Sequence, residues 1–166
     1  MPDLLTHTLL NVALPAGRLR RRELLVFVFG GVLPDIVSRV PAISISRTIQ
    51  PIAVSQGVDL DWVVTGFGAL HLPLGLLFVV TALAAGLPRF LLDGVPRRRL
   101  AALLLGGGVA HLLLDVMQWH VRPSYRYLFP FSMRPLELGW FDSDVGFFAW
   151  PILVPLAWWA WRRSDP

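Results

Sequence analysis

Long apolar runs constrain this chain more than any other feature of its sequence. Four runs are each about 18 residues or longer, which is the length that an α-helix needs to cross about 30 Å of hydrocarbon. The hydrophobic share of 55% and the mean hydropathy of +0.60 exceed the values usual for soluble domains. The sequence therefore predicts an all-α polytopic membrane helix bundle, a single domain over residues 1–166. Its predicted transmembrane spans are residues 23–40, 62–87, 100–117 and 144–161.

A fifth apolar segment, residues 4–14, is too short to span a bilayer. We predict that it forms a short N-terminal re-entrant or interfacial helix. Asp3, His7 and Asn11 follow one another at steps of four residues, so they form a polar stripe along one face of this helix. Such a stripe must face protein, a cavity or lipid headgroups.

All fifteen basic residues are arginines, and their distribution indicates a membrane topology rather than a nucleic-acid surface. Ten of them precede the first span, separate the second span from the third, or follow the fourth, and the positive-inside rule places such segments in the cytoplasm. We therefore predict a multi-pass protein of the inner or plasma membrane, with lipid as its surroundings. No nucleic-acid-binding motif is present, which argues against a nucleic-acid partner. The lack of cysteine excludes thiolate metal ligands and disulfides.

The third span contains an HxxxD motif within the stretch GGGVAHLLLDVMQWH, residues 106–120. His111 and Asp115 are four residues apart, so their side chains lie one turn apart on the same helix face. An imidazole nitrogen and a carboxylate oxygen that converge from one rigid helix are well placed to bind one metal ion. The alternative is a His–Asp hydrogen bond that satisfies two polar groups in a packed interior.

Three further ionisable side chains, His7, Asp35 and His71, are predicted to meet His111 and Asp115 at a similar depth. By helical rise, Asp35 lies about 18 Å and His111 about 16 Å from the cytoplasmic ends of their spans, and His71 about 14 Å from the outer end of its own. Burying such groups separately is costly, about 2.5 to 3.5 kcal/mol for one aspartate at the centre of a span. Convergence on a divalent metal ion such as Zn²⁺ or Mn²⁺, in the outer half of the bundle, lowers this cost. The predicted metal ligands are His7, Asp35, His71, His111 and Asp115.

Asp35 also has a simpler interpretation. Arg39 follows it by four residues and is placed to form a salt bridge with it on the helix surface. The sequence leaves both interpretations of Asp35 open.

Two segments are predicted to be external loops, residues 41–61, with a short surface helix as an alternative for part of it, and about residues 118–143. The first shows no chemistry. The second contains Arg122, Arg126 and Arg134, which are suited to binding an anionic group such as a phosphate and equally to lying at a membrane interface. Asp142 is a candidate catalytic residue, as a general base, although it is equally suited to capping the last helix.

Several motifs occur in a recognisable order: TH at residues 6–7, LPD at 33–35, a histidine in a small-residue helix, HLLLD at 111–115, and LFPFS at 128–132 followed by an acid. This order resembles the YdjM/YbcI type of inner-membrane metal-dependent hydrolases, and the similarity covers residues 7–142. The resemblance implies a small helical membrane protein with hydrolase activity. By position, it assigns the five predicted ligands above to the metal site.

The chain departs from that family at one element. Family members commonly read HRGxTHS there, with two histidines five residues apart. This chain has Gly66 in place of the first histidine and keeps only His71. The expected metal site therefore has one ligand fewer than the resemblance implies.

Three functions are compatible with these residues. The first is a membrane-bound metal-dependent hydrolase in which His and Asp ligands from several helices hold the metal that activates water. Its predicted substrate is a phosphodiester or a lipid headgroup. The second is a non-catalytic membrane protein with a structural metal or a hydrogen-bonded His/Asp centre. The third is an ion path that uses the same groups as relays.

Overall fold

The structure is a computed structural model that describes residues 4–15, 17–88, 95–119, 126–129, 131–132, 134–142 and 145–164. Over these ranges the chain is mostly helical, which confirms the predicted helical class. The strands within the described residues are β1 (Gln118–Trp119) and β2 (Phe141–Asp142), which pair in parallel. They close the two ends of the segment that was predicted to be a long loop.

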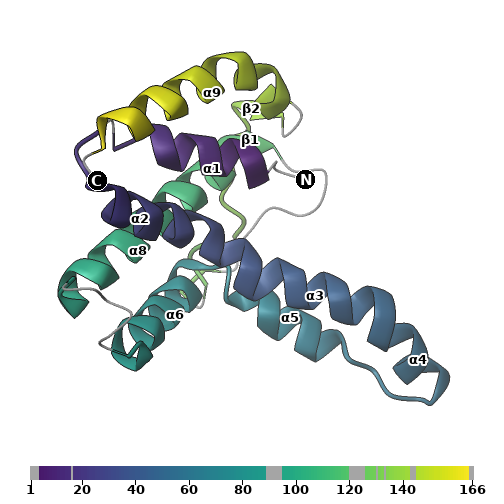
Figure 1. Ribbon diagram of the computed structural model, residues 1–166. Coiled ribbons are helices and arrows are strands. Elements are labelled where there is room, and N and C mark those ends of the chain that lie inside the picture. Colours follow the sequence, from purple (N-terminus) through teal and green to yellow (C-terminus); the bar gives the residue numbers. More distant parts are fainter. Residues whose placement is uncertain are drawn as a thin grey trace.

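The helices of the main body form successive layers (Figure 1). Helix α9 (Val145–Arg163) lies over α1 (Leu4–Ala13), so the first and last helices of the chain pack against each other. Helix α1 rests in turn on α2 (Arg21–Pro34), which packs most extensively against α8 (Arg97–Met117). Helix α6 (Pro73–Gly86) covers the far side of α8.

Glycines allow the backbones of α2 and α8 to come into direct contact. A Cβ atom at Gly107 would overlap the Phe27 carbonyl oxygen, and one at Gly30 would overlap the Leu104 carbonyl oxygen. Small residues at such crossings are typical of helices that pack within membranes. The close approach brings the middle of α8, with His111, against the end of α2.

The helix that begins with α2 continues far beyond the predicted first span. It runs through η1 (Asp35–Arg39), α3 (Val40–Ser44), η2 (Ile45–Ile49) and α4 (Gln50–Ser55). The prediction of a loop at residues 41–61 was therefore wrong for most of its length.

Two prolines lie within this continuous helix. Pro41 and Pro51 each follow a π-helical segment, and the carbonyl four residues before each proline lies inside that segment. A proline ring normally clashes with this carbonyl, and the wider π turn relieves the clash. The helix therefore continues through residues that usually end one.

The polar residues of this helix bond to their own backbone. The Ser44 hydroxyl donates to the Val40 carbonyl oxygen at 2.8 Å, and the Ser46 hydroxyl donates to the Ala42 carbonyl oxygen at 2.7 Å. Such bonds satisfy a hydroxyl without a tertiary partner. Together with α5 (Asp61–Ala69), α3 and α4 form an arm that projects away from the main body (Figure 1).

The second predicted span, residues 62–87, is broken in the structure. Helices α5 and α6 are bent by 76° relative to each other. The break falls at His71, because Leu72 adopts an extended conformation and Pro73 begins the next helix. Proline at the first helical position is favoured because its missing N–H has no partner there in any case. The break turns the buried His71 toward the main body.

Within the described residues, two helices are long and apolar enough to cross a membrane, Arg21–Ser55 and Arg97–Met117, or three if the bent pair counts as one span. This is compatible with a membrane location. The fourth predicted span, residues 144–161, corresponds to α9, which does not meet the same criterion. Pro151, Pro155 and its tryptophans lower the hydropathy of α9 below that of an aliphatic run.

Candidate metal centre

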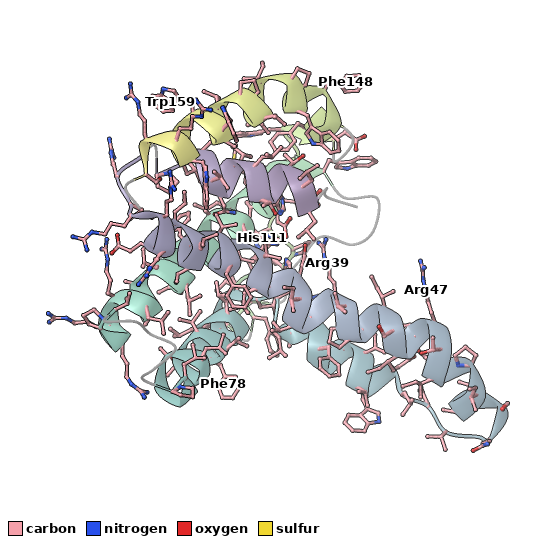
Figure 2. All side chains as sticks on the ribbon, in the orientation of Figure 1. Arg39, Arg47, Phe78, His111, Phe148 and Trp159 are labelled. Atoms are coloured by element: carbon pink, nitrogen blue, oxygen red, sulfur yellow. The ribbon has the colours of Figure 1, made fainter. Side chains whose placement is uncertain are left out.

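The five predicted ligands lie together in the interior, where α1, η1, α8 and the break before α6 meet. His7, His111 and Asp115 have no exposed surface, and His71 is 1% exposed. Asp35 is the least buried of the five, at 7%. Figure 2 shows His111 inside the main body with Arg39 near it, while Arg47 lies on the arm. The predicted convergence of residues from four separate segments is therefore present.

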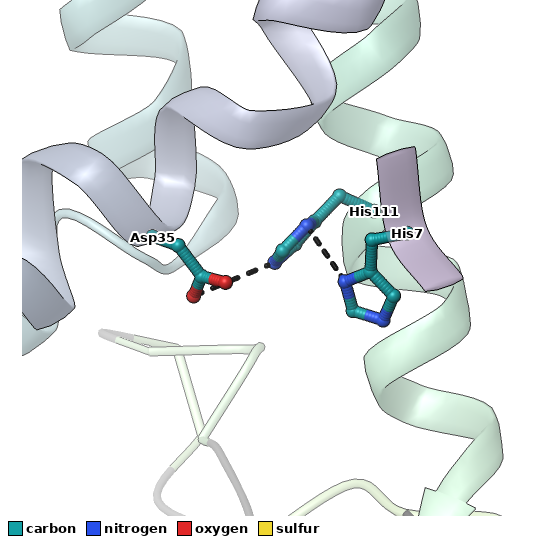
Figure 3. Close-up of side chains that lie close together, drawn as sticks. All are labelled: His7, Asp35 and His111. Atoms are coloured by element: carbon teal, nitrogen blue, oxygen red, sulfur yellow. Dashed lines mark hydrogen bonds and ion pairs between the residues drawn. The ribbon is translucent and has the colours of Figure 1, made fainter. Parts of the chain in front are cut away.

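A hydrogen bond joins the imidazole rings of His7 and His111 (Figure 3). Their Nδ1 atoms are 2.9 Å apart, and the ring planes are nearly perpendicular, at 82°. One of the two rings must therefore carry its proton on Nδ1. In a neutral imidazole this leaves Nε2 with an unprotonated lone pair, which is the form that binds a metal.

The position of His7 within α1 keeps its imidazole neutral. Burial, together with the neighbouring His111, lowers the pKa of His7 to about 4. Asn11, one turn further along α1, is also fully buried and donates to the His7 carbonyl oxygen at 2.9 Å. His7 and Asn11 of the predicted polar stripe therefore face protein, and Asp3 lies outside the described residues.

His71 uses both ring nitrogens in hydrogen bonds. Its Nε2 lies 2.6 Å from Asp115 Oδ2, and its Nδ1 lies 3.2 Å from Ser38 Oγ. The Ser38 hydroxyl donates its proton to the Pro34 carbonyl oxygen at 2.5 Å, so it can only accept from His71. With Asp115 ionised, Nε2 of His71 is the donor in the bond to Asp115. The predicted alternative of a His–Asp hydrogen bond is therefore present, but it joins Asp115 to His71 rather than to His111.

Arg39 supplies a positive charge. Its Nε lies 3.0 Å from Asp35 Oδ1, which confirms the salt bridge considered for this pair, and its Nη2 lies 3.8 Å from Asp115 Oδ2. The side chain is 15% exposed, so it lies at the rim of the centre. The guanidinium is therefore within ion-pair distance of both carboxylates of the centre.

Apart from Asp35 Oδ1, which has its ion pair with Arg39, two ligand atoms of the centre have no hydrogen-bond partner among the described residues, His111 Nε2 and Asp115 Oδ1. His111 Nε2 lies 3.4 Å from Asp115 Oδ2, and Asp115 Oδ1 lies 3.6 Å from His7 Nε2. Ligands of a tetrahedral ion with bonds of about 2.0–2.1 Å lie about 3.3 Å apart. These atoms are therefore spaced as neighbouring ligands rather than as hydrogen-bonded pairs.

Two groups of three ligand atoms could each hold a metal ion, and within each group the atoms lie within 4.8 Å of one another. One group is His7, Asp35 and His111, and the other is His71, His111 and Asp115. Nitrogen and oxygen donors of this kind suit Zn²⁺ and Mn²⁺. The donor set and the two orphaned atoms fit a divalent cation, and His111 is common to both groups.

Two polar residues of the centre, Ser38 and Gln118, were not predicted from the sequence. Ser38 follows Asp35 by three residues, and Gln118 follows His111 by seven, so helical spacing places each on the side of a predicted ligand. Gln118 is 1% exposed, with its Nε2 3.5 Å from His7 Nε2. This spacing can be read from the sequence, but neither a serine nor a glutamine indicates a metal site by itself.

Three of the predicted substrate-binding and catalytic residues, Arg126, Arg134 and Asp142, lie outside this interior. Arg126 and Arg134 are exposed, and Arg122 lies outside the described residues. Asp142 is exposed on β2, opposite Trp119 of β1. Gly66, which stands where the family resemblance implies a histidine, has open space around it on α5.

Comparisons with protein-family models, with curated proteins and with solved structures find no match to this chain, so its family is a prediction that rests on the motifs above.

Proposed function

We propose that this chain is a membrane-bound metal-dependent hydrolase whose metal site is the buried His/Asp centre. The observation that carries the proposal is the meeting of three histidines and two aspartates from four segments, with two ligand atoms left without hydrogen-bond partners. A bound divalent cation supplies Lewis acidity toward a substrate oxygen and activates water at neutral pH. The proposed family, the YdjM/YbcI type, has the same chemistry.

The proposed substrate is a phosphodiester or a lipid headgroup. Asp35 and Arg39 are the most exposed charged residues of the centre, so we place the approach of substrate on their side. The planar guanidinium of Arg39 offers donors that match phosphate oxygens. Arg122, Arg126 and Arg134 are the proposed second contact for an anionic headgroup, and Asp142 is the proposed general base.

The proposed setting is a multi-pass protein of the inner or plasma membrane. Its arginine-rich segments lie in the cytoplasm, as the positive-inside rule favours. The metal centre then lies toward the outer half of the bilayer.

Metal content and hydrolysis are measured together to test this function. Detergent-purified full-length protein is analysed for bound metal and assayed against phosphodiesters and phospholipids. The proposal expects bound metal and hydrolysis in the unchanged chain, with both lost in His111→Ala and both reduced in Asp115→Asn, which leaves one group of ligands intact. Arg47→Ala, on the arm and away from the centre, is the matched control and keeps both. A metal-free protein without hydrolytic activity would refute the proposal.

One observation favours a second candidate, a structural centre without catalysis. His7, His111 and Asp115 have no exposed surface, so no substrate reaches them without movement of the surrounding helices. This function expects the His111→Ala variant to lose metal and thermal stability together. It also expects no hydrolysis in the unchanged, metal-loaded protein, which separates it from the first candidate.

A further inference from the structure

An apolar groove lies at the other end of the bundle from the metal centre. It has a volume of about 280 Å³ and is walled by α2, α6 and α8. Its residues on α8 precede His111 by seven and eleven positions, so the groove lies on the order of 10 Å or more from the centre along that helix. Its lining includes Leu25 and Phe29 of α2, Leu83 of α6, and Leu100 and Leu104 of α8.

The walls of this groove face the surroundings of the protein. Leu25 is 55% exposed and Phe29 is 47% exposed. Both belong to one of the two helices that are long and apolar enough to cross a membrane. In a bilayer, the exposed side of such a groove contacts the hydrocarbon core. A lipid acyl chain is therefore the ligand that is available to it.

One end of the groove carries arginines. Arg22 precedes Leu25, Val26 and Phe29 by three, four and seven residues, so it shares their helix face. On α8, Arg97 precedes Leu100 by three residues and Leu104 by seven, so it shares their helix face. Exposed guanidinium groups at the end of an apolar groove form an amphipathic site with a positive head.

The surrounding contacts hold this arrangement in place. Arg97 donates to the Ala84 carbonyl oxygen at 3.0 Å and to the Leu87 carbonyl oxygen at 3.2 Å, so it ties the end of α6 to α8 beside the groove. The nearby acid, Glu23, is paired with Arg99 at 2.8 Å. Among the described residues at this end of the groove, Arg22, Arg97 and Arg99 outnumber the one carboxylate, Glu23, so the local charge of these residues is positive.

We propose that this groove is a binding site for an anionic phospholipid, with an acyl chain between α2, α6 and α8 and the phosphate at Arg22 and Arg97. Apolar contact holds the chain, and the arginines select an anionic headgroup over a zwitterionic one. The site is separate from the metal centre and does not depend on hydrolysis.

Native mass spectrometry of the detergent-solubilised full chain tests the proposal. Phosphatidylglycerol and phosphatidylcholine with identical chains are added in parallel. The expected result is selective retention of phosphatidylglycerol. Arg22→Gln weakens that retention about fivefold, the factor typical of one basic residue near an anionic lipid. Arg47→Gln, which removes an exposed arginine from the arm, leaves it unchanged.

A second variant tests the groove itself. Leu25→Trp fills the groove and is expected to weaken phosphatidylglycerol retention, whereas Ile52→Trp, at an exposed position of α4, does not. Equal retention of both lipids, or no effect of Leu25→Trp, overturns the proposal. Displacement of the lipid by glycerol phosphate at equal concentration would show a headgroup site without a chain site and also overturns it. A lipid-free dimer that Leu25→Trp disrupts would show that a second copy occupies the groove instead.

Discussion

At the scale of single residues, His111 is the side chain on which both possible metal groups depend. It belongs to each group, whereas His7 and His71 belong to one group each. Replacing His111 by alanine is therefore expected to abolish metal binding. His7→Ala and His71→Ala are each expected to weaken binding and leave one group intact. Isothermal titration with Zn²⁺ and Mn²⁺ measures the three affinities, and equal losses in all three variants would contradict the two-group description.

Arg39 holds the carboxylates in the arrangement that the structure shows, and it competes with a cation for them. A unit charge about 4 Å away interacts by about 4 kcal/mol at an effective dielectric constant of 20. Arg39→Gln is therefore expected to raise the affinity for a divalent cation by about tenfold or more. The metal-free variant is expected to be less stable, because Asp35 loses its partner. Unchanged affinity would show that the guanidinium moves aside when metal binds.

Metal binding is also expected to release a proton. His71 Nε2 faces Asp115 Oδ2 at 2.6 Å as a proton donor in the metal-free arrangement, and a ring nitrogen that carries a proton cannot be a ligand. Titration in buffers of different ionisation enthalpy counts the released protons. Asp115→Asn, which removes the carboxylate partner of His71, is expected to lower that count. Zero protons released from the unchanged chain would argue that His71 stays outside the coordination sphere.

The buried His7 makes the stability of the metal-free protein depend on pH. Its folded-state pKa of about 4 lies below the usual 6.5, so the unfolded chain binds more protons between these values. Stability is therefore expected to fall as pH drops from about 6.5 to about 4 and to be constant above that window with respect to this group. Thermal unfolding at several pH values measures the slope, and His7→Gln is expected to reduce it. An identical slope in that variant would assign the effect to another residue.

At the scale of elements, the crossing of α2 and α8 depends on the absence of side chains. Gly107→Ala is expected to destabilise the protein by about 3 kcal/mol or more, because its Cβ meets backbone that cannot move aside. Gly66→Ala is the matched control, since open space surrounds that position on α5. It is expected to be neutral or to stabilise the helix by up to about 1 kcal/mol. Chemical unfolding of both variants in detergent gives the comparison.

The sequence predicted the helical class, the two most apolar spans and the five residues of the centre. Hydropathy and helical spacing are local properties, and α8 carries both without interruption. The sequence did not predict the helix through residues 41–55, because Pro41 and Pro51 normally stop a helix unless the backbone widens before them. Pro73 predicted a kink next to His71, and the structure has a bend of 76° there, whose size depends on how α6 packs against α8.

At the scale of the whole molecule, the proposed orientation can be tested directly because the chain has no cysteine. Arg98→Cys lies at the arginine-rich end and Ser55→Cys at the far end of the continuous helix. Both positions are exposed. A membrane-impermeant thiol reagent added to intact cells is expected to label Ser55→Cys and not Arg98→Cys, and to label both after lysis. The opposite pattern would reverse the orientation, and labelling of both in intact cells would show that they lie on one side.

The π-helical segment Asp35–Arg39 sets the direction in which the arm leaves the main body. A π turn holds one residue more than an α turn, and one residue of an α-helix corresponds to about 100° of rotation. A chain that lost a single residue between Asp35 and Val40 would keep its hydropathy almost unchanged, but Pro41 would follow a narrower α turn. Everything beyond that point, α3 and α4 included, would nevertheless turn through about a quarter of a circle about the helix axis. Chain length at this one point, rather than amino-acid type, therefore determines where the arm points.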